Sequence, residues 1–154
     1  IARGSCGGSA EWSLTEDGTL TISGTGAMEN YSDKSAQGWY GHADAINTVI
    51  ISDGITHIGS RAFDGCSALT EITIPDSVTD IEWSAFEDCS SLTEITIPDS
   101  VTNIGSWAFS LCDNLSDVYY GGSQSDWSKI KIDYWSNNYL TNAKIHYNSA
   151  MPET

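Results

Sequence analysis

The residues that most often perform catalysis are few and scattered in this sequence. Its three histidines are His42, His57 and His146. They belong to no His-Glu-x-x-His pair, and the sequence has no Gly-x-Ser-x-Gly turn and no glycine-rich phosphate-binding loop. His57 is expected on a turn near Asp80, a position that is more often solvated than catalytic. The sequence therefore predicts that the protein is not an enzyme and needs no cofactor.

The cysteines are the next candidates for chemistry, either as disulfides or as metal ligands. Three of the four lie 23 residues apart, at Cys66, Cys89 and Cys112, with no Cys-x-x-Cys pair and no histidine at ligand spacing, so nothing supports a zinc site. Stacked strands about 4.8 Å apart would allow a disulfide between two of them, although parallel Cβ directions make one awkward. We expect buried, free thiols that serve as small apolar side chains. Cys6 lies outside this series, and its pairing is not predicted.

These cysteines mark one position of a 23-residue repeat, and the repeat positions most other side chains. Three copies follow one another without a break, and their sequences are INTVIISDGITHIGSRAFDGCSA, LTEITIPDSVTDIEWSAFEDCSS and LTEITIPDSVTNIGSWAFSLCDN. A fourth copy begins in phase at Leu115 and then departs from the pattern. One such unit cannot bury its own apolar side, whereas about three stacked units with end caps bury a continuous core. The sequence therefore predicts a solenoid, an architecture that binds partners far more often than it catalyses.

Within a repeat, the spacing of apolar residues predicts one strand and a return path. Ile72 and Ile74 alternate along the chain and are expected to point inward from a strand. Val78 and Ile81 then take the chain across the far side of the coil. The phenylalanines of the protein share one position of the repeat: Phe63, Phe86 and Phe109. They predict an aromatic stack through the core.

Both ends of the repeat array are expected to be capped. Two short alternating segments around Glu16-Asp17-Gly18 predict a β-hairpin that covers the first coil, and residues 23–33 are expected to form a loop. At the other end, residues 125–130 predict a short helix and residues 143–147 a closing strand. We therefore expect one domain over residues 1–148, followed by a tail. Residues 1–45 form the N-terminal cap and residues 46–114 the three repeats. Residues 115–148 form the partial repeat with the C-terminal cap, and residues 149–154 are the tail.

The composition disfavours several classes of partner. Six lysines and arginines against 21 aspartates and glutamates give a formal net charge of −15. Such a field repels phosphate backbones and anionic lipid surfaces, so we expect no nucleic acid partner. No apolar run approaches the roughly 18–20 residues that span a bilayer, so we expect no direct membrane insertion. The chain begins at Ile1 without a basic and apolar leader, which we interpret as a processed product or an excised piece whose targeting segment lies outside it.

The repeat and its flanks resemble a known family. The segment LTEITIPDSVTNIGSWAFSLC is similar to the BspA-type leucine-rich repeat of bacterial surface proteins, and the segments GTLTISGTG, YYGG and IHYN are similar to those that often border such repeats. The resemblance implies a leucine-rich repeat solenoid with a short parallel β-sheet on its concave face and irregular or short helical turns on its convex face. It also implies secretion, display, and attachment to host matrix proteins or other bacteria. Glu82 departs from the pattern, because the other copies carry Gly59 and Gly105 there.

If Ile72 and Ile74 face inward, the residues beside them face outward from the concave sheet. Successive repeats then form two rows: Thr48, Glu71, Glu94 and Asp117, and Ile50, Thr73, Thr96 and Tyr119. Three stacked carboxylates repel one another unless a basic partner or a cation covers them. The alternative is a solvated acidic stripe that protects the edge. Calcium could bridge these acids, but no Asp-x-Asp-x-Asp-Gly loop supports it, so no metal site is predicted.

Trp83 and Trp107 are the remaining binding candidates. They lie on the turn side, where the other copies carry serine or arginine. An exposed tryptophan is typical of an interface anchor. A tryptophan on a turn can equally pack over the neighbouring coil, and both alternatives stay open.

The last four residues, Met151 to Thr154, resemble the Leu-Pro-x-Thr-Gly sorting signal of cell-wall-anchored proteins. The match ends at Thr154, the residue that sortase would join to the wall. Met replaces Leu, and the sequence carries no following Gly, apolar segment or basic tail. Wall anchoring through Thr154 is therefore an expectation that rests on the repeat family as much as on these residues.

We expect a secreted or cell-surface, adhesin-like module that recognises a host or microbial protein, such as an extracellular matrix protein, through its concave face. Two alternatives stay open. The solenoid could be a structural spacer that presents another domain of a larger surface protein, or an accessory domain that recruits substrate for an enzyme. The sequence does not predict the oligomeric state.

Overall fold

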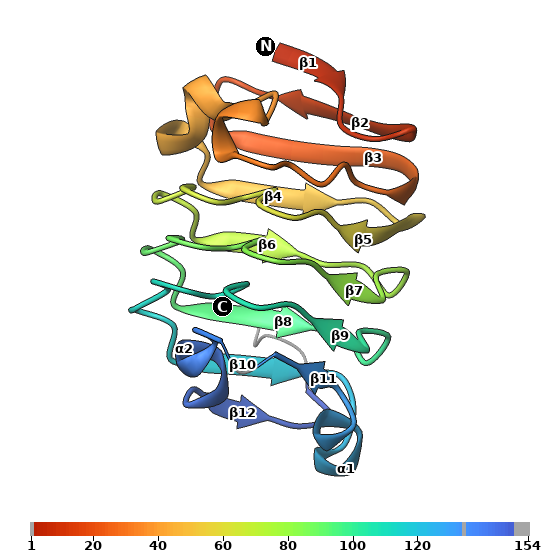
Figure 1. The fold of residues 1–154 in the computed structure, drawn as a ribbon, viewed down its shortest axis with the longest axis vertical. Coiled ribbons are helices and arrows are strands. Elements are labelled where there is room, and N and C mark those ends of the chain that lie inside the picture. The colour runs from red at the N-terminus through yellow and green to blue at the C-terminus, as the bar shows by residue number, and fades with distance from the viewer. Residues whose placement is uncertain (1, 134, 150–154) are drawn as a thin grey trace.

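The computed structural model describes residues 2–133 and 135–149 of the chain. Figure 1 shows successive coils stacked in sequence order along the long axis of the molecule, beginning with an antiparallel cap and ending with a cap of short helices and strands. Each coil contributes two strands, so two ladders run along the stack. The solenoid predicted from the 23-residue repeat is confirmed.

The main ladder is formed by the strand that opens each coil, and it is the sheet expected on the concave face. Its members are the first part of β3 (Thr19–Ala27), then β4 (Thr48–Ile51), β6 (Glu71–Thr73), β8 (Glu94–Ile97), β10 (Asp117–Tyr120) and β12 (Lys144–His146). All of these pair in parallel. Among the described strands the pairing is interrupted once, because β6 pairs only with β4 while β8 belongs to a separate sheet with β10 and β12. Ile72 and Ile74 are both buried, which confirms the inward-facing phase.

The second ladder follows the first in each coil, and the sequence did not predict it. It consists of the end of β3, then β5 (Ile55–Ile58), β7 (Asp80–Ile81), β9 (Asn103–Ile104) and β11 (Lys131–Ile132), all in parallel. The loop expected from residue 23 onward was wrong in its first part, because Gly26 lies in β3 and pairs with Ile55. Ile81 likewise lies in a strand instead of an irregular crossing. A two-residue strand leaves no alternation in the sequence for pattern analysis to detect.

The rest of each coil consists of tight turns. Their backbone hydrogen bonds span three residues, as from the Ala62 N–H to the Gly59 carbonyl and from the Cys66 N–H to the Phe63 carbonyl, each at 3.1 Å. These turns confirm the irregular or short helical segments expected outside the sheet. Two positions in each repeat have positive φ angles: Arg61, Ser84 and Trp107, and Gly65, Asp88 and Leu111.

The core is a column of like residues from successive coils. The rings of Phe63 and Phe86 are stacked at 5.4 Å, and those of Phe86 and Phe109 at 5.3 Å, so the predicted aromatic stack is confirmed. Trp39 continues this stack at the N-terminal end, 5.9 Å from Phe63. All four cysteines are buried and free, as expected for the three in the repeat: Cys6, Cys66, Cys89 and Cys112. Burial raises the pKa of the Cys66 thiol to about 12, which keeps it protonated and unreactive.

The N-terminal cap is a three-stranded antiparallel sheet with two short helices beside it. Its elements are β1 (Ala2–Ser5), β2 (Ser9–Leu14), β3, and the 3-10 helices η1 (Lys34–Ala36) and η2 (Tyr40–Ala45). The predicted hairpin is confirmed as β2 and β3, whereas β1 was not predicted. Gln37 fastens this cap to the first repeat, because its buried side-chain amide donates hydrogen bonds to the carbonyls of Arg61 and Asp64.

The C-terminal cap mixes short helices and strands, as the sequence predicted. It contains α1 (Gln124–Ser128), β11, α2 (Asn138–Thr141) and β12. Helix α1 and strand β12 match the predicted helix and closing strand, while β11 and α2 were not predicted. A capping box fixes the start of α1, since Ser123 accepts from the Asp126 N–H and the Asp126 carboxylate accepts from the Ser123 N–H. In the described part of the chain, none of the helices has the length and apolar character that a membrane crossing requires.

Candidate interaction surface

The outer face of the main ladder carries the two predicted rows in strand register. The acidic row runs through Thr19, Thr48, Glu71, Glu94, Asp117 and Lys144. The mixed row runs through Thr21, Ile50, Thr73, Thr96, Tyr119 and His146. Within each row the pairing stops between β6 and β8. The structure thus brings all eight predicted concave-face residues onto one surface and adds to each row one residue from the N-terminal cap and one from the C-terminal cap.

The three carboxylates of the acidic row differ in their partners. Asp117 shares a hydrogen bond of 2.8 Å with Nε2 of His146 and accepts another of 2.8 Å from the Ser116 hydroxyl. These two bonds, with that of His146 the larger cause, hold the pKa of Asp117 below its ordinary value. Glu71 and Glu94 make no hydrogen bond or ion pair within the described residues. The uncompensated charge of the acidic row therefore lies at these two glutamates.

The mixed row ends in an aromatic pair. The rings of Tyr119 and His146 are nearly parallel, at 10°, with centroids 4.5 Å apart. Ile50, on β4 near the N-terminal end of the row, is 40% exposed. A flat ring pair beside the carboxylate of Asp117 suits a cationic or aromatic group from a partner. The sequence did not indicate His146 because it lies 29 residues beyond Asp117, out of phase with the repeat, and only the register of β12 places it there.

Trp83 and Trp107 lie in turns and not in the main ladder. They are 40% and 41% exposed. The guanidinium of Arg61 lies 4.3 Å from the centre of the Trp83 ring, so this tryptophan packs on the preceding coil, as one of the two alternatives expected. Trp107 has a φ of 66° and donates its N–H to the Trp135 carbonyl at 2.8 Å. Bulky residues rarely adopt this backbone conformation.

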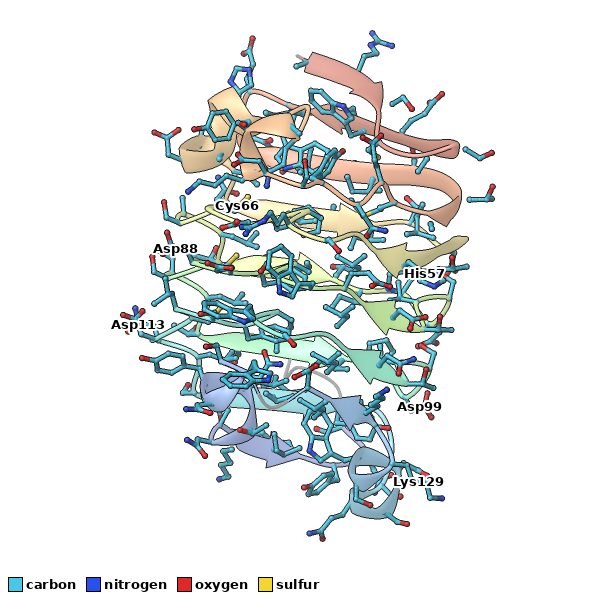
Figure 2. All side chains as sticks on the ribbon, in the orientation of Figure 1. His57, Cys66, Asp88, Asp99, Asp113 and Lys129 are labelled. Carbon is cyan, nitrogen blue, oxygen red and sulfur yellow. The ribbon has the colours of Figure 1, made fainter. Side chains whose placement is uncertain are left out.

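A separate polar cluster lies on the second ladder. Nε2 of His57 is 3.0 Å from Oδ2 of Asp80. One ligand atom from each of His57, Asp80 and Glu82 lies within 4.8 Å of the others, and this is the one such group of three potential metal ligands in the described residues. Figure 2 shows His57 at the edge formed by the second ladder, with Asp88 and Asp113 of the turns at the opposite edge. The sequence contained a signal for this cluster, since His57 and Asp80 occupy the same position in consecutive repeats.

The candidate anchoring residue, Thr154, lies outside the described residues, as do the three residues before it.

The sequence model of the protein family described as BspA type leucine rich repeat region matches residues 36–151 of this chain. The chain belongs to this family. It is a family of bacterial leucine-rich repeat proteins, and its repeat domains typically bind proteins and are not catalytic.

Solved structures of bacterial leucine-rich repeat proteins share the fold. One from Eubacterium ventriosum is 27% identical with a TM-score of 0.58, and the match covers 82% of this chain and 45% of that one. One from Bacteroides capillosus is 21% identical with a TM-score of 0.50, covering 73% of this chain and 94% of that one. The chain thus spans less than half of the Eubacterium ventriosum protein that it matches. A comparison with curated proteins found no match.

Proposed function

We propose that this member of the family is a secreted or cell-surface, adhesin-like module that binds an extracellular protein through the outer face of its main ladder. The observation that carries the proposal is the pair of in-register rows on that face, with Glu71 and Glu94 unpaired in one and exposed Ile50 and the Tyr119–His146 ring pair in the other. Unmatched charge beside exposed apolar groups is typical of a surface that a partner covers.

The charges on this face favour a basic partner. Glu71 and Glu94 are two carboxylates without partners among the described residues, on a chain whose net charge is −15. A lysine- or arginine-rich segment would neutralise them, and the field of the whole chain would steer such a partner toward the surface. Matrix and plasma proteins of a host and surface proteins of other bacteria are the partners we propose to test.

The test is saturable binding of the purified domain to a panel of extracellular matrix and plasma proteins, at physiological salt, with and without calcium. The Glu71→Lys/Glu94→Lys variant reverses the charge of the face. The matched control is Asp99→Lys/Asp113→Lys, which makes the same change of net charge at two exposed acids outside the main ladder; Figure 2 labels both. We expect the first variant to lose at least about tenfold in affinity while staying folded and the control to lose much less, since only close charge pairs contribute strongly.

The other outcomes distinguish the alternatives. Equal losses in both variants would indicate attraction to the net charge and not to this face. Absence of binding across the panel would favour the structural spacer. Loss of binding in a Trp107→Ala variant, with both charge variants unaffected, would move the interaction to the turn side. A catalytic domain beside this one in the full polypeptide would favour the accessory role.

The proposed location is extracellular, and we propose further that Thr154 attaches the protein to the cell wall. The test is surface labelling of intact cells that express the full protein, compared with a Thr154→Ala variant. Loss of the variant from the cell wall, with release to the medium, is the expected result if Thr154 is the anchoring residue. Unchanged retention of the variant on the cell wall would contradict anchoring through Thr154. The surface labelling would still test whether the protein is extracellular.

A further inference from the structure

The outer face of the second ladder gathers side chains that the proposed function does not use. His57 on β5 and Asp80 on β7 are Cα partners in the ladder, and Nε2 of His57 lies 3.0 Å from Oδ2 of Asp80. Glu82 follows β7 and brings a second carboxylate, with the three ligand atoms within 4.8 Å of one another. Atoms bound tetrahedrally to one zinc ion lie about 2.0 to 2.2 Å from the metal and therefore about 3.3 to 3.6 Å from each other. The 3.0 Å between the His57 and Asp80 ligand atoms is close to this range, and the ligand atom of Glu82 lies within 4.8 Å of both.

Neighbouring groups orient the first two of these side chains. Nδ1 of His57 is 2.8 Å from the Thr56 hydroxyl, so Nδ1 can carry the proton and leave the lone pair of Nε2 toward Asp80. Asp80 is held from two sides. Its Oδ1 accepts from the Asn103 amide at 2.8 Å, and its Oδ2 accepts from the Thr79 hydroxyl at 2.6 Å. Outer partners of this kind commonly fix metal ligands in place.

The presence of a carboxylate at position 82 is a second, independent observation in favour of a binding site on this face. The other two copies of the repeat carry glycine at this position, where a Cβ would lie 1.9 Å from the Glu29 carbonyl at Gly59 and 2.8 Å from the Trp83 nitrogen at Gly105. The second repeat alone has a carboxylate there. Within the described residues this carboxylate makes no hydrogen bond or ion pair, so no such partner accounts for its presence.

We propose that His57, Asp80 and Glu82 form a binding site for one divalent transition-metal ion, with zinc as its best representative. One imidazole and two carboxylates are a borderline donor set, which suits Zn²⁺ better than Ca²⁺, whose ligands are oxygens. The side chains of His57 and Asp80 are 38% and 20% exposed, so the ion can enter from solvent and keeps open positions for water. Asp80 and Glu82 also line a shallow groove of about 210 Å³ with Lys131 and Asp133, which borders the site.

The test is calorimetric titration of the metal-free protein with Zn²⁺, and in a parallel arm with Ca²⁺. Three variants are compared with the wild type. His57→Gln and Glu82→Gln each remove one ligand, and Glu82→Gln disturbs no hydrogen bond among the described residues, so it guards against loss of folding in the first. His146→Gln is the matched control, because it removes the other histidine–aspartate pair, which lies on the main ladder. Circular dichroism checks folding throughout.

We expect one Zn²⁺ ion per chain, an affinity at least about tenfold lower in His57→Gln and in Glu82→Gln, and no change in His146→Gln. The Co²⁺ complex should show the weak absorption of a nitrogen and oxygen ligand set without an intense thiolate band, since the cysteines are buried. Absence of saturable Zn²⁺ binding would overturn the proposal, and so would binding that both ligand variants retain. Binding of Ca²⁺ that depends on Glu82 and not on His57 would also overturn it, because the site would then be a simple acidic cluster.

Discussion

The outer faces of the two ladders come from the same repeat, yet they treat charge in opposite ways. On the second ladder, neighbouring coils place unlike groups beside one another, since His57 pairs with Asp80 and Asp80 accepts from Asn103. On the main ladder, Glu71 and Glu94 follow one another without a partner among the described residues. On the second ladder the strand residues pair with one another, and the unpaired carboxylate of Glu82 beside them suits a small ion. An unmatched row leaves its charge for a larger partner, which is why we place macromolecular binding there.

Removing the core that both ladders share should have the largest effect. Phe86→Ala deletes the central ring of the stack, which is fully buried between Phe63 and Phe109. We expect a loss of about 3–5 kcal/mol in the free energy of unfolding, measured by urea denaturation. Trp83→Ala is the control, because this side chain is 40% exposed and its removal should cost much less. A loss below about 1 kcal/mol for Phe86→Ala would mean that the stack does not hold the two ladders together.

A smaller difference in stability is expected between a variant of the second ladder and a variant of the main ladder. Asp80→Ala removes the hydrogen bonds to Asn103 and Thr79 and the contact with His57, so we expect it to destabilise the protein by about 1 kcal/mol. Glu94→Ala, the corresponding change on the main ladder, removes no such contact and relieves repulsion, so its effect should lie within about 0.5 kcal/mol of zero. Urea denaturation of both variants measures the difference. Equal losses would show that the two faces do not differ in the way we infer.

The smallest effect concerns the one matched carboxylate of the main ladder. Asp117 has its pKa lowered from the ordinary 3.8, chiefly by the hydrogen bond with His146. A lowered pKa means that the stabilisation is present above pH 3.8 and is lost as the pH falls through the lower folded value. In His146→Gln we expect the pKa of Asp117 to rise toward 3.8, as followed by NMR titration of its side-chain carbons. An unchanged pKa in the variant would show that Ser116 alone holds the carboxylate.

The fold could be predicted from the sequence to the extent that it repeats. A 23-residue period places the same repeat positions inside each successive coil. The inward phase of Ile72 and Ile74, the stacked phenylalanines and the buried cysteines all follow from it. The second ladder could not be predicted, because strands of two residues such as Asp80–Ile81 show no alternation. Strand β3 was only half recognised, since its glycine-rich end has the composition of a loop and becomes a strand by pairing with β5.

The candidate surface divides in the same way. Thr48, Glu71, Glu94 and Asp117 could be placed in one row because they share a phase of the repeat. His146 could not, because the C-terminal cap has no repeat to set its register and joins the row only through the pairing of β12 with β10. The sequence also left Trp83 open between an anchor and a packing residue. The position of the Arg61 guanidinium over its ring, which depends on the turn geometry of two coils, favours packing.

The amino-acid sequence alone is enough to predict that this chain is a stack of coils with a shared core, because a periodic apolar pattern can be buried only by stacking its copies. The same pattern predicts which residues face outward from the main ladder. Which of the outward residues lie in contact depends on the three-dimensional fold. Asp117 has a histidine beside it, Glu71 and Glu94 have none, and His57, Asp80 and Glu82 converge, because strand register and turn geometry set side-chain distances that the one-dimensional period does not contain.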